Sequence, residues 1–226
     1  MRPRDRSRSL AVPTTIAAAP WYSGLDPSTE KLFARRRLLV RLLAIFGICV
    51  GLSFVVWGII AAQYLWPALR PLPRSHALRL LLLVHSFRFI GLAFVVPGVV
   101  SPDLPAEFAR PAAYGDLIAA VLALVALAGL PSRFGLGLVW AFNLWGSADL
   151  LYAFYQGLIG VGIEPGQLGA AYFIPTVVVP LLLITHGLVF RLSLRRDGVA
   201  GWRDSERAAE PGAAPDLARM WAFFDV

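Results

Sequence analysis

The chain has 226 residues, of which 58% are hydrophobic and only 15% are charged. Soluble domains carry about 25% charged residues, so this composition argues against a water-soluble protein and favours an integral membrane protein. The formal net charge is +7, but the basic residues lie in the tails and beside apolar segments, where they suit anionic lipid headgroups. No nucleic-acid-binding motif accompanies them, so nucleic acid is not expected as a partner.

Residues 1–34 are predicted to form a basic, mostly disordered N-terminal tail. The tail opens with four arginines in its first eight residues, and its apolar stretch at 10–19 is interrupted by Pro13. That stretch is a poor hydrophobic region for a signal peptide, so cleavage after it is the less favoured interpretation.

Five apolar segments within residues 35–193 are each long enough to cross a bilayer as a helix, which takes about 17–25 residues. The predicted spans are residues 38–66, 78–100, 114–130, 134–158 and 168–192. Prolines fall in the connections, as expected of helix ends and turns. The expected fold is therefore all-α, a polytopic transmembrane helix bundle with about five spans.

Residues 194–226 are predicted to form a polar C-terminal tail. Its last part, residues 216–226, contains Trp221, Phe223 and Phe224, which would give a short amphipathic helix an apolar side. An interfacial anchor and a mostly disordered tail are both compatible with this composition.

The distribution of basic residues is nearly symmetric, which makes the orientation difficult to predict. With five spans the two tails lie on opposite sides, and equal numbers of Lys and Arg fall on each side. The cluster of Arg35, Arg36, Arg37 and Arg41 directly before the first span favours a cytoplasmic N-terminus under the positive-inside rule. We expect an inner-membrane, multi-pass protein in this orientation.

Ionisable and strongly polar residues inside spans are costly in a bilayer and usually face the bundle interior, so they are where a function is expected. The candidate polar cluster consists of His85, Arg88, Asp116, Asn143, Asp149 and His186.

The depths of these residues can be compared because neighbouring spans run antiparallel. At 1.5 Å per residue, His85, Asn143 and His186 are expected about 10–14 Å below the same surface. Arg88 and Asp149 are expected nearer the midplane. An Arg88–Asp149 ion pair is therefore predicted.

Two alternatives to that prediction stay open. Asp116, expected close to the opposite surface, is the other candidate partner of Arg88. The pair could also be purely structural and hold two helices together.

The two histidines at matched depth raise the hypothesis of a b-type haem with His85 and His186 as axial ligands. A histidine hydrogen-bonded to Asn143 or to a backbone carbonyl is the favoured alternative. Other metals are disfavoured because the carboxylates are few and scattered. The lone cysteine, Cys49, permits no intramolecular disulfide. No catalytic motif is present, so an enzyme is the less favoured class.

Four stretches of the chain together resemble a set of uncharacterised bacterial polytopic membrane proteins. They are HSFRFIG from His85, LPAEFARPAAYGD ending at Asp116, NLWGSAD from Asn143 to Asp149, and the segment from Pro175 to His186. The resemblance covers about residues 78–193 and implies one recurring pattern that includes Arg88, Asp116, Asn143, Asp149 and His186. It implies no activity.

Three functional hypotheses are compatible with these patterns. The first is a small-molecule or ion binding module of transport-like type, built on the polar cluster. The second is a structural subunit that uses the cluster as a lock and docks a membrane-protein partner or a second copy through its tails. The third is the haem protein. In each case the lipid bilayer is the expected environment, with anionic headgroups at the basic tails.

Overall fold

The structure, a computed structural model, describes residues 27–195. The first 26 residues and the predicted C-terminal amphipathic helix at 216–226 lie outside the described residues. Contacts divide the chain into two units, Met1–Leu39 and Val40–Val226. The boundary falls inside the first helix, and every later helix belongs to the second unit.

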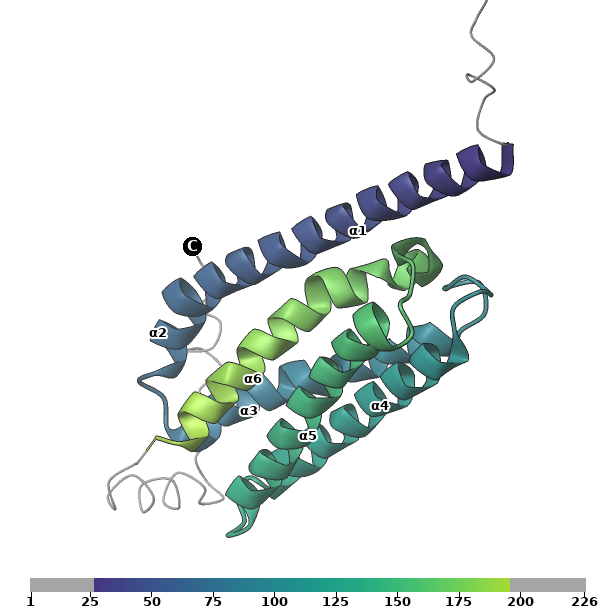
Figure 1. The fold of residues 1–226 in the computed structure, drawn as a ribbon. Coiled ribbons are helices and arrows are strands. Elements are labelled where there is room, and N and C mark those ends of the chain that lie inside the picture. The colour runs from purple at the N-terminus through teal and green to yellow at the C-terminus, as the bar shows by residue number, and fades with distance from the viewer. Residues whose placement is uncertain (1–26, 196–226) are drawn as a thin grey trace, which may run out of the picture. The chain divides into compact units, whose positions relative to one another are not determined.

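The regular elements of the described residues are all helical, and an isolated bridge joins Pro97 and Val100. In chain order they are α1 (Pro27–Ile60), the π-helical turn η1 (Ala61–Leu65), α2 (Trp66–Leu69), α3 (Arg74–Ser86), the 3-10 helix η2 (Phe87–Val95), α4 (Ala106–Gly129), α5 (Gly135–Tyr155), the π-helical turn η3 (Gln156–Gly160), the 3-10 helix η4 (Pro165–Tyr172), the π-helical turn η5 (Ile174–Val178) and α6 (Val179–Ser193) (Figure 1).

Among residues 27–195, four helical segments are long and apolar enough to cross a membrane: Ser28–Leu69, Arg74–Val95, Ala106–Gly129 and Ile174–Ser193. The prediction of an all-helical fold with helices of membrane-spanning length and hydropathy is confirmed for the described residues. α5 is a 21-residue helix but is not among the four. It carries Asn143 and Asp149 within its length, and such polar residues lower its mean hydropathy.

Helix ends differ from the predicted boundaries, chiefly where proline begins a helix. α1 begins at Pro27, inside the predicted tail, and α4 begins directly after Pro105 instead of at residue 114. Proline fits a helix start because its missing N–H would have no intrahelical partner there. The helical span that begins at Arg74 ends at Val95, five residues before the predicted end.

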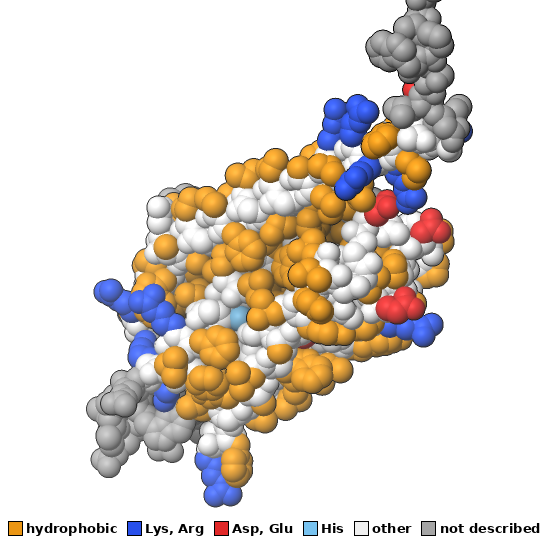
Figure 2. Space-filling model, in the orientation of Figure 1, with side chains coloured by type: hydrophobic (Ala, Val, Ile, Leu, Met, Phe, Trp, Pro, Cys, Tyr) orange, Lys and Arg blue, Asp and Glu red, His pale blue; other side chains and the backbone are white. Residues whose placement is uncertain are grey.

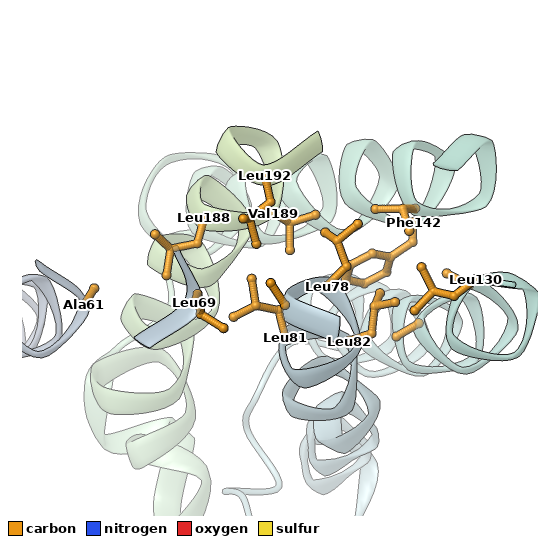
Figure 3. Packing of buried hydrophobic residues seen from close by; sticks show 14 residues of the cluster. Ala61, Leu69, Leu78, Leu81, Leu82, Leu130, Phe142, Leu188, Val189 and Leu192 are labelled. Atoms are coloured by element: carbon orange, nitrogen blue, oxygen red, sulfur yellow. The ribbon is translucent and has the colours of Figure 1, made fainter. Parts of the chain in front are cut away.

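Helices α3, α4, α5 and α6 pack as a four-helix group. α3 contacts α4, α4 contacts α5, α5 contacts α6, and α6 contacts α3 (Figure 1). One apolar core lies among the start of α3, the end of α4, the start of α5 and the end of α6, where Leu78, Leu82, Phe142, Val189 and Leu192 meet (Figure 3).

A second apolar core lies at the other end of the same helices. It includes Phe94 of η2, Phe108 of α4, Leu150 of α5 and Leu182 of α6. Along α3–η2, α4, α5 and α6, the residues of the polar cluster come between the residues of the two cores. The polar cluster is therefore enclosed between two apolar layers.

The outward faces of the helices are apolar. Large side chains such as Leu80, Phe87, Leu124 and Leu151 are exposed, and hydrophobic side chains cover much of the surface visible in Figure 2. Exposed apolar area of this extent is unusual for a soluble protein and fits lipid contact. The span that begins with α1 is the least buried of the four; Trp57 ties it to η5 by donating from Nε1 to the Val177 carbonyl at 3.1 Å.

Candidate functional site: one arginine between two carboxylates

The buried arginine is positioned by a change of helix type. α3 gives way to the 3-10 helix η2 at Phe87, one residue before Arg88. A 3-10 helix has three residues per turn, and the buried residues of η2 are Arg88, Gly91 and Phe94, three apart. In the last turn of α3, the Ser86 hydroxyl donates to the Leu82 carbonyl at 3.0 Å. Such back-bonding often bends helices.

All three nitrogens of the Arg88 guanidinium have partners. Nε donates to Asp116 Oδ1 at 2.8 Å, and Nη2 donates to Asp149 Oδ2 at 2.6 Å and lies 2.6 Å from Asp116 Oδ1. Nη1 donates to the Gly146 carbonyl at 3.1 Å and lies 3.3 Å from His186 Nε2. Arg88 is therefore paired with two carboxylates, one from α4 and one from α5.

His186 is oriented by a second hydrogen bond. Its Nδ1 lies 2.7 Å from Asn143 Oδ1, and Asn143 Nδ2 donates to the His186 carbonyl at 3.4 Å. An amide oxygen only accepts, so Nδ1 carries the proton, and Nε2 accepts from Arg88. This tautomer is neutral. With both carboxylates ionised, the ion pairs at the site combine one positive and two negative groups.

His85 lies against His186 and the core residue Phe142. Its ring centroid is 4.1 Å from that of His186 and 5.0 Å from that of Phe142. His85 Nε2 lies 3.1 Å from the Thr185 hydroxyl, which itself donates to the Leu181 and Leu182 carbonyls. Nε2 is therefore the protonated nitrogen. Nδ1 is buried without a hydrogen-bond partner among the described residues.

Three glycines make room for the cluster. A Cβ added at Gly91 would collide with the Asp116 side chain, one at Gly115 with the Asp149 carboxylate, and one at Gly146 with His186 and Arg88. The sequence presents them only as positions of close helix approach. Gly137, which has the same appearance in sequence, has no atom within 4 Å of such a Cβ.

The structure brings all six predicted residues together. His85, Asn143 and His186, expected at one depth, are in contact. Asp149 and Asp116 were alternatives as the partner of Arg88, and both bind it. The expectation that Asp116 lies close to the opposite surface is wrong, because α4 begins at Ala106 and puts Asp116 almost three turns inside the helix.

Sequence reasoning missed two contributors to the cluster, the Thr185 hydroxyl and the Gly146 carbonyl. The only sign of Thr185 in the sequence was that it is a hydroxyl residue next to His186. A backbone carbonyl carries no signal in sequence at all.

The two histidine rings are in direct contact, which leaves no space for a porphyrin between them. His186 also has both ring nitrogens engaged, and His85 has Nε2 engaged. This arrangement does not fit bis-histidine ligation of haem. Among residues 27–195, no group of three or more His, Cys, Asp or Glu side chains is placed to hold a metal ion.

A pocket of about 630 Å³, partly open, reaches the two carboxylates. Its walls come from α1, η2, α4, α5 and the segments before α6, and include Phe46, Phe94, Phe108 and Phe154. Asp116 and Asp149 are its only charged lining residues.

Residues 45–194 match a family model described as a domain of unknown function, DUF8737. The chain belongs to this family. The matched segment contains all six residues of the polar cluster and every wall of the pocket except Leu43. No curated protein and no solved structure matches the chain. The DUF8737 match therefore shows an uncharacterised family and assigns no activity to the site.

Proposed function

We propose that this chain is a bacterial inner-membrane protein of five spans that binds a small molecule or ion at the Arg88–Asp116–Asp149 cluster, as a transport-like module. The observation that carries the proposal is the pocket. Its walls are apolar, and the carboxylates of Asp116 and Asp149 lie in its lining. Small-molecule sites typically combine apolar walls with a few convergent polar groups.

The fifth span in this proposal is α5. Its polar residues do not face lipid, because Asn143 is fully enclosed and Asp149 is bound to Arg88. Helix α5 packs against both α4 and α6. Intramembrane polar residues that face a bundle interior are tolerated in a span, so low mean hydropathy does not exclude α5.

Irregular backbone around the pocket supports the transport-like part. The 3-10 helix η2 contributes Phe94, the π turn η3 contributes Gly157 and Leu158, and the π turn η5 contributes Ile174 and Pro175 to its lining. Non-α backbone at membrane depth is tolerated where it is buried in protein or lines a cavity, and π turns are frequent at functional sites.

The FRxxG, GD and NxxGxxD motifs would then be the signature of this site, because each contains at least one residue of the polar cluster and one of the three glycines that make room for the cluster. In this proposal the basic tails contact anionic lipid headgroups.

A hydrophobic carbodiimide tests whether the carboxylates are reachable. Dicyclohexylcarbodiimide enters apolar membrane sites and modifies carboxyl groups. We expect it to label Asp149 or Asp116 in the protein reconstituted in phosphatidylcholine nanodiscs, as measured by peptide mass spectrometry. Ala153→Phe, which places a large side chain in the pocket lining, should abolish that labelling. A water-soluble carbodiimide should instead label the exposed Glu107 in both proteins.

The second candidate function is a structural subunit of a membrane assembly. The observation that favours it is the complete pairing of Arg88, which links η2, α4 and α5 in one closed network. Two results together would favour the structural subunit over the ligand-binding module. Dicyclohexylcarbodiimide would label neither carboxylate of the correctly folded wild type, and the protein would co-purify with a defined partner in mild detergent.

A further inference from the structure

The pocket lining carries two carboxylates that share one described cation, Arg88. Asp116 Oδ1 and Asp149 Oδ2 bind Arg88, and each carboxylate has a second oxygen that accepts no hydrogen bond from residues 27–195. The two side chains are 9% and 12% exposed, whereas that of Arg88 is 0% exposed. Both aspartates line the pocket and Arg88 does not.

With both carboxylates ionised, the charges of the cluster do not balance. One guanidinium serves two carboxylates, and the hydrogen bonds of His186 assign it the neutral tautomer. A positive ligand would compensate the remaining negative charge. An anion would meet two carboxylates, and a neutral apolar molecule would leave their oxygens without a partner, which is costly in an apolar site.

The walls select for an organic cation over a metal ion. Phe46, Phe94, Phe108 and Phe154 line the pocket, and Phe94 and Phe108 pack edge to face with ring centroids 5.6 Å apart. Aromatic faces attract cations, including ammonium groups. Two carboxylates surrounded by apolar side chains supply too few oxygen ligands for a calcium ion, which takes six to eight.

The charged residues at the two ends of the bundle are consistent with a cationic ligand. Asp103, Glu107 and Glu164 lie at the end of the bundle where α4 begins and α5 ends, together with Arg110 and with Arg41 of α1, two residues before the pocket residue Leu43. The opposite end carries arginines only: Arg70, Arg74, Arg79, Arg133, Arg191 and Arg195 are its charged residues in the described part of the chain. Clefts near negative charge concentrate cations.

We propose that the pocket binds a monovalent organic cation, with its charged centre against the carboxylates of Asp116 and Asp149 and its apolar body against the phenylalanine walls. This inference rests on the proposed function, because it names the class of ligand that the same site takes.

Three probes with one apolar body and different head groups test the inference: 4-phenylbutylamine, which is a cation at pH 7, 4-phenylbutyrate and 4-phenylbutanol. The full chain is placed in phosphatidylcholine nanodiscs, and binding is measured by titration calorimetry against empty nanodiscs at the same lipid concentration. We expect the amine to bind at least tenfold more tightly than the acid or the alcohol.

Two carboxylate variants distinguish binding in the pocket from attraction of the amine to surface charge. Asp149→Asn should weaken binding of the amine at least tenfold, and Glu107→Gln, an exposed residue on α4, should leave it unchanged. Ala153→Phe should remove binding of all three probes. The comparison of head groups on the wild type needs no variant, so it stays informative if Asp149→Asn fails to fold.

The possible failures are distinguishable. If the acid or the alcohol binds as tightly as the amine and Ala153→Phe removes that binding, the site exists but the assignment to cations is wrong. If none of the probes binds beyond empty nanodiscs, both the cation inference and the small-molecule site are overturned. If Glu107→Gln weakens binding as much as Asp149→Asn, the amine binds by surface charge and the inference is wrong.

Discussion

Arg88 is the residue on which the polar cluster depends, because within residues 27–195 it is the cation bound to both buried Asp116 and partly buried Asp149. Replacing it by methionine leaves Asp116 and Asp149 next to each other without a counter-charge. Breaking a buried pair by removing one partner costs about 3–5 kcal/mol. We expect Arg88→Met to lower the free energy of unfolding by this amount, measured by titration with dodecyl sulfate in mixed micelles.

Arg79→Met is the matched control for this change. Arg79 lies nine residues earlier on α3 and is exposed, so its replacement should change the free energy of unfolding by about 0.5 kcal/mol or less. Equal effects of the two substitutions would show that Arg88 is not held as the structure has it.

Replacing one carboxylate and replacing both should affect the stability of the protein differently. Asp116→Asn or Asp149→Asn alone leaves Arg88 with one carboxylate, a balanced pair. The double change leaves Arg88 as an unpaired buried cation. We therefore expect the double variant to be less stable than the sum of the two single effects, with a coupling of about 0.5–3 kcal/mol. Strict additivity in the same dodecyl sulfate titration would contradict a shared guanidinium.

The glycines beside the cluster give a prediction with an internal control. A methyl group at Gly115 would overlap the Asp149 carboxylate, so Gly115→Ala should destabilise the protein by about 1–3 kcal/mol. Gly137 has open space at the same position. Gly137→Ala should be neutral or stabilising by up to about 1 kcal/mol, because alanine favours helix. Similar thermal stabilities of the two variants would be evidence against the close packing at Gly115.

At the scale of elements, helix α5 depends on its neighbours for a place in the membrane. Asp at the centre of a span costs about 2.5–3.5 kcal/mol on insertion scales, and Leu contributes about −0.5 kcal/mol. In a translocon-insertion reporter that carries the α5 segment alone, Asp149→Leu should favour insertion by about 3 kcal/mol. Ala148→Leu is the control and should change insertion by less than about 1 kcal/mol. Equal gains would show that Asp149 does not limit α5.

Helix existence was predictable from the sequence, but helix type was not. Apolar length and flanking prolines indicate where the helices lie. The switch from α3 to η2 depends on how Arg88, Gly91 and Phe94 meet α4, a contact between elements. The start of α4 was predicted eight residues late, because Pro105 and Pro111 together look like a loop in a linear reading.

At the scale of the whole molecule, one experiment can test both the number of spans and the orientation. We propose a cytoplasmic N-terminus, which is supported by the basic residues Arg35, Arg36, Arg37 and Arg41 at the first span. The six arginines at the end of the bundle where α6 ends would favour the opposite orientation, with that end in the cytoplasm. Arg195 and Arg74 join at that end, since Arg74 Nη1 donates to the Arg195 carbonyl at 3.1 Å.

Single cysteines decide between these arrangements. In a Cys49→Ala background, Arg133→Cys marks the connection before α5 and Gly166→Cys marks the segment after η3; both positions are exposed. With five spans and a cytoplasmic N-terminus, a membrane-impermeant maleimide added to intact cells should label residue 133 and not residue 166. The reverse pattern would invert the orientation. Equal labelling of both positions would mean that α5 does not span.

The sequence by itself determined the membrane class, the helical fold and the identity of the six polar residues. These follow from local properties, because burying a charge or an amide in a bilayer is costly wherever it occurs. Only the tertiary structure decided that one guanidinium serves both carboxylates, that the histidine rings touch, and that an aromatic pocket opens onto the acidic side of the cluster. Depth along a helix can be counted from a sequence, but the rotation of each helix about its axis is set by packing against its neighbours, and that rotation determines which side chains meet.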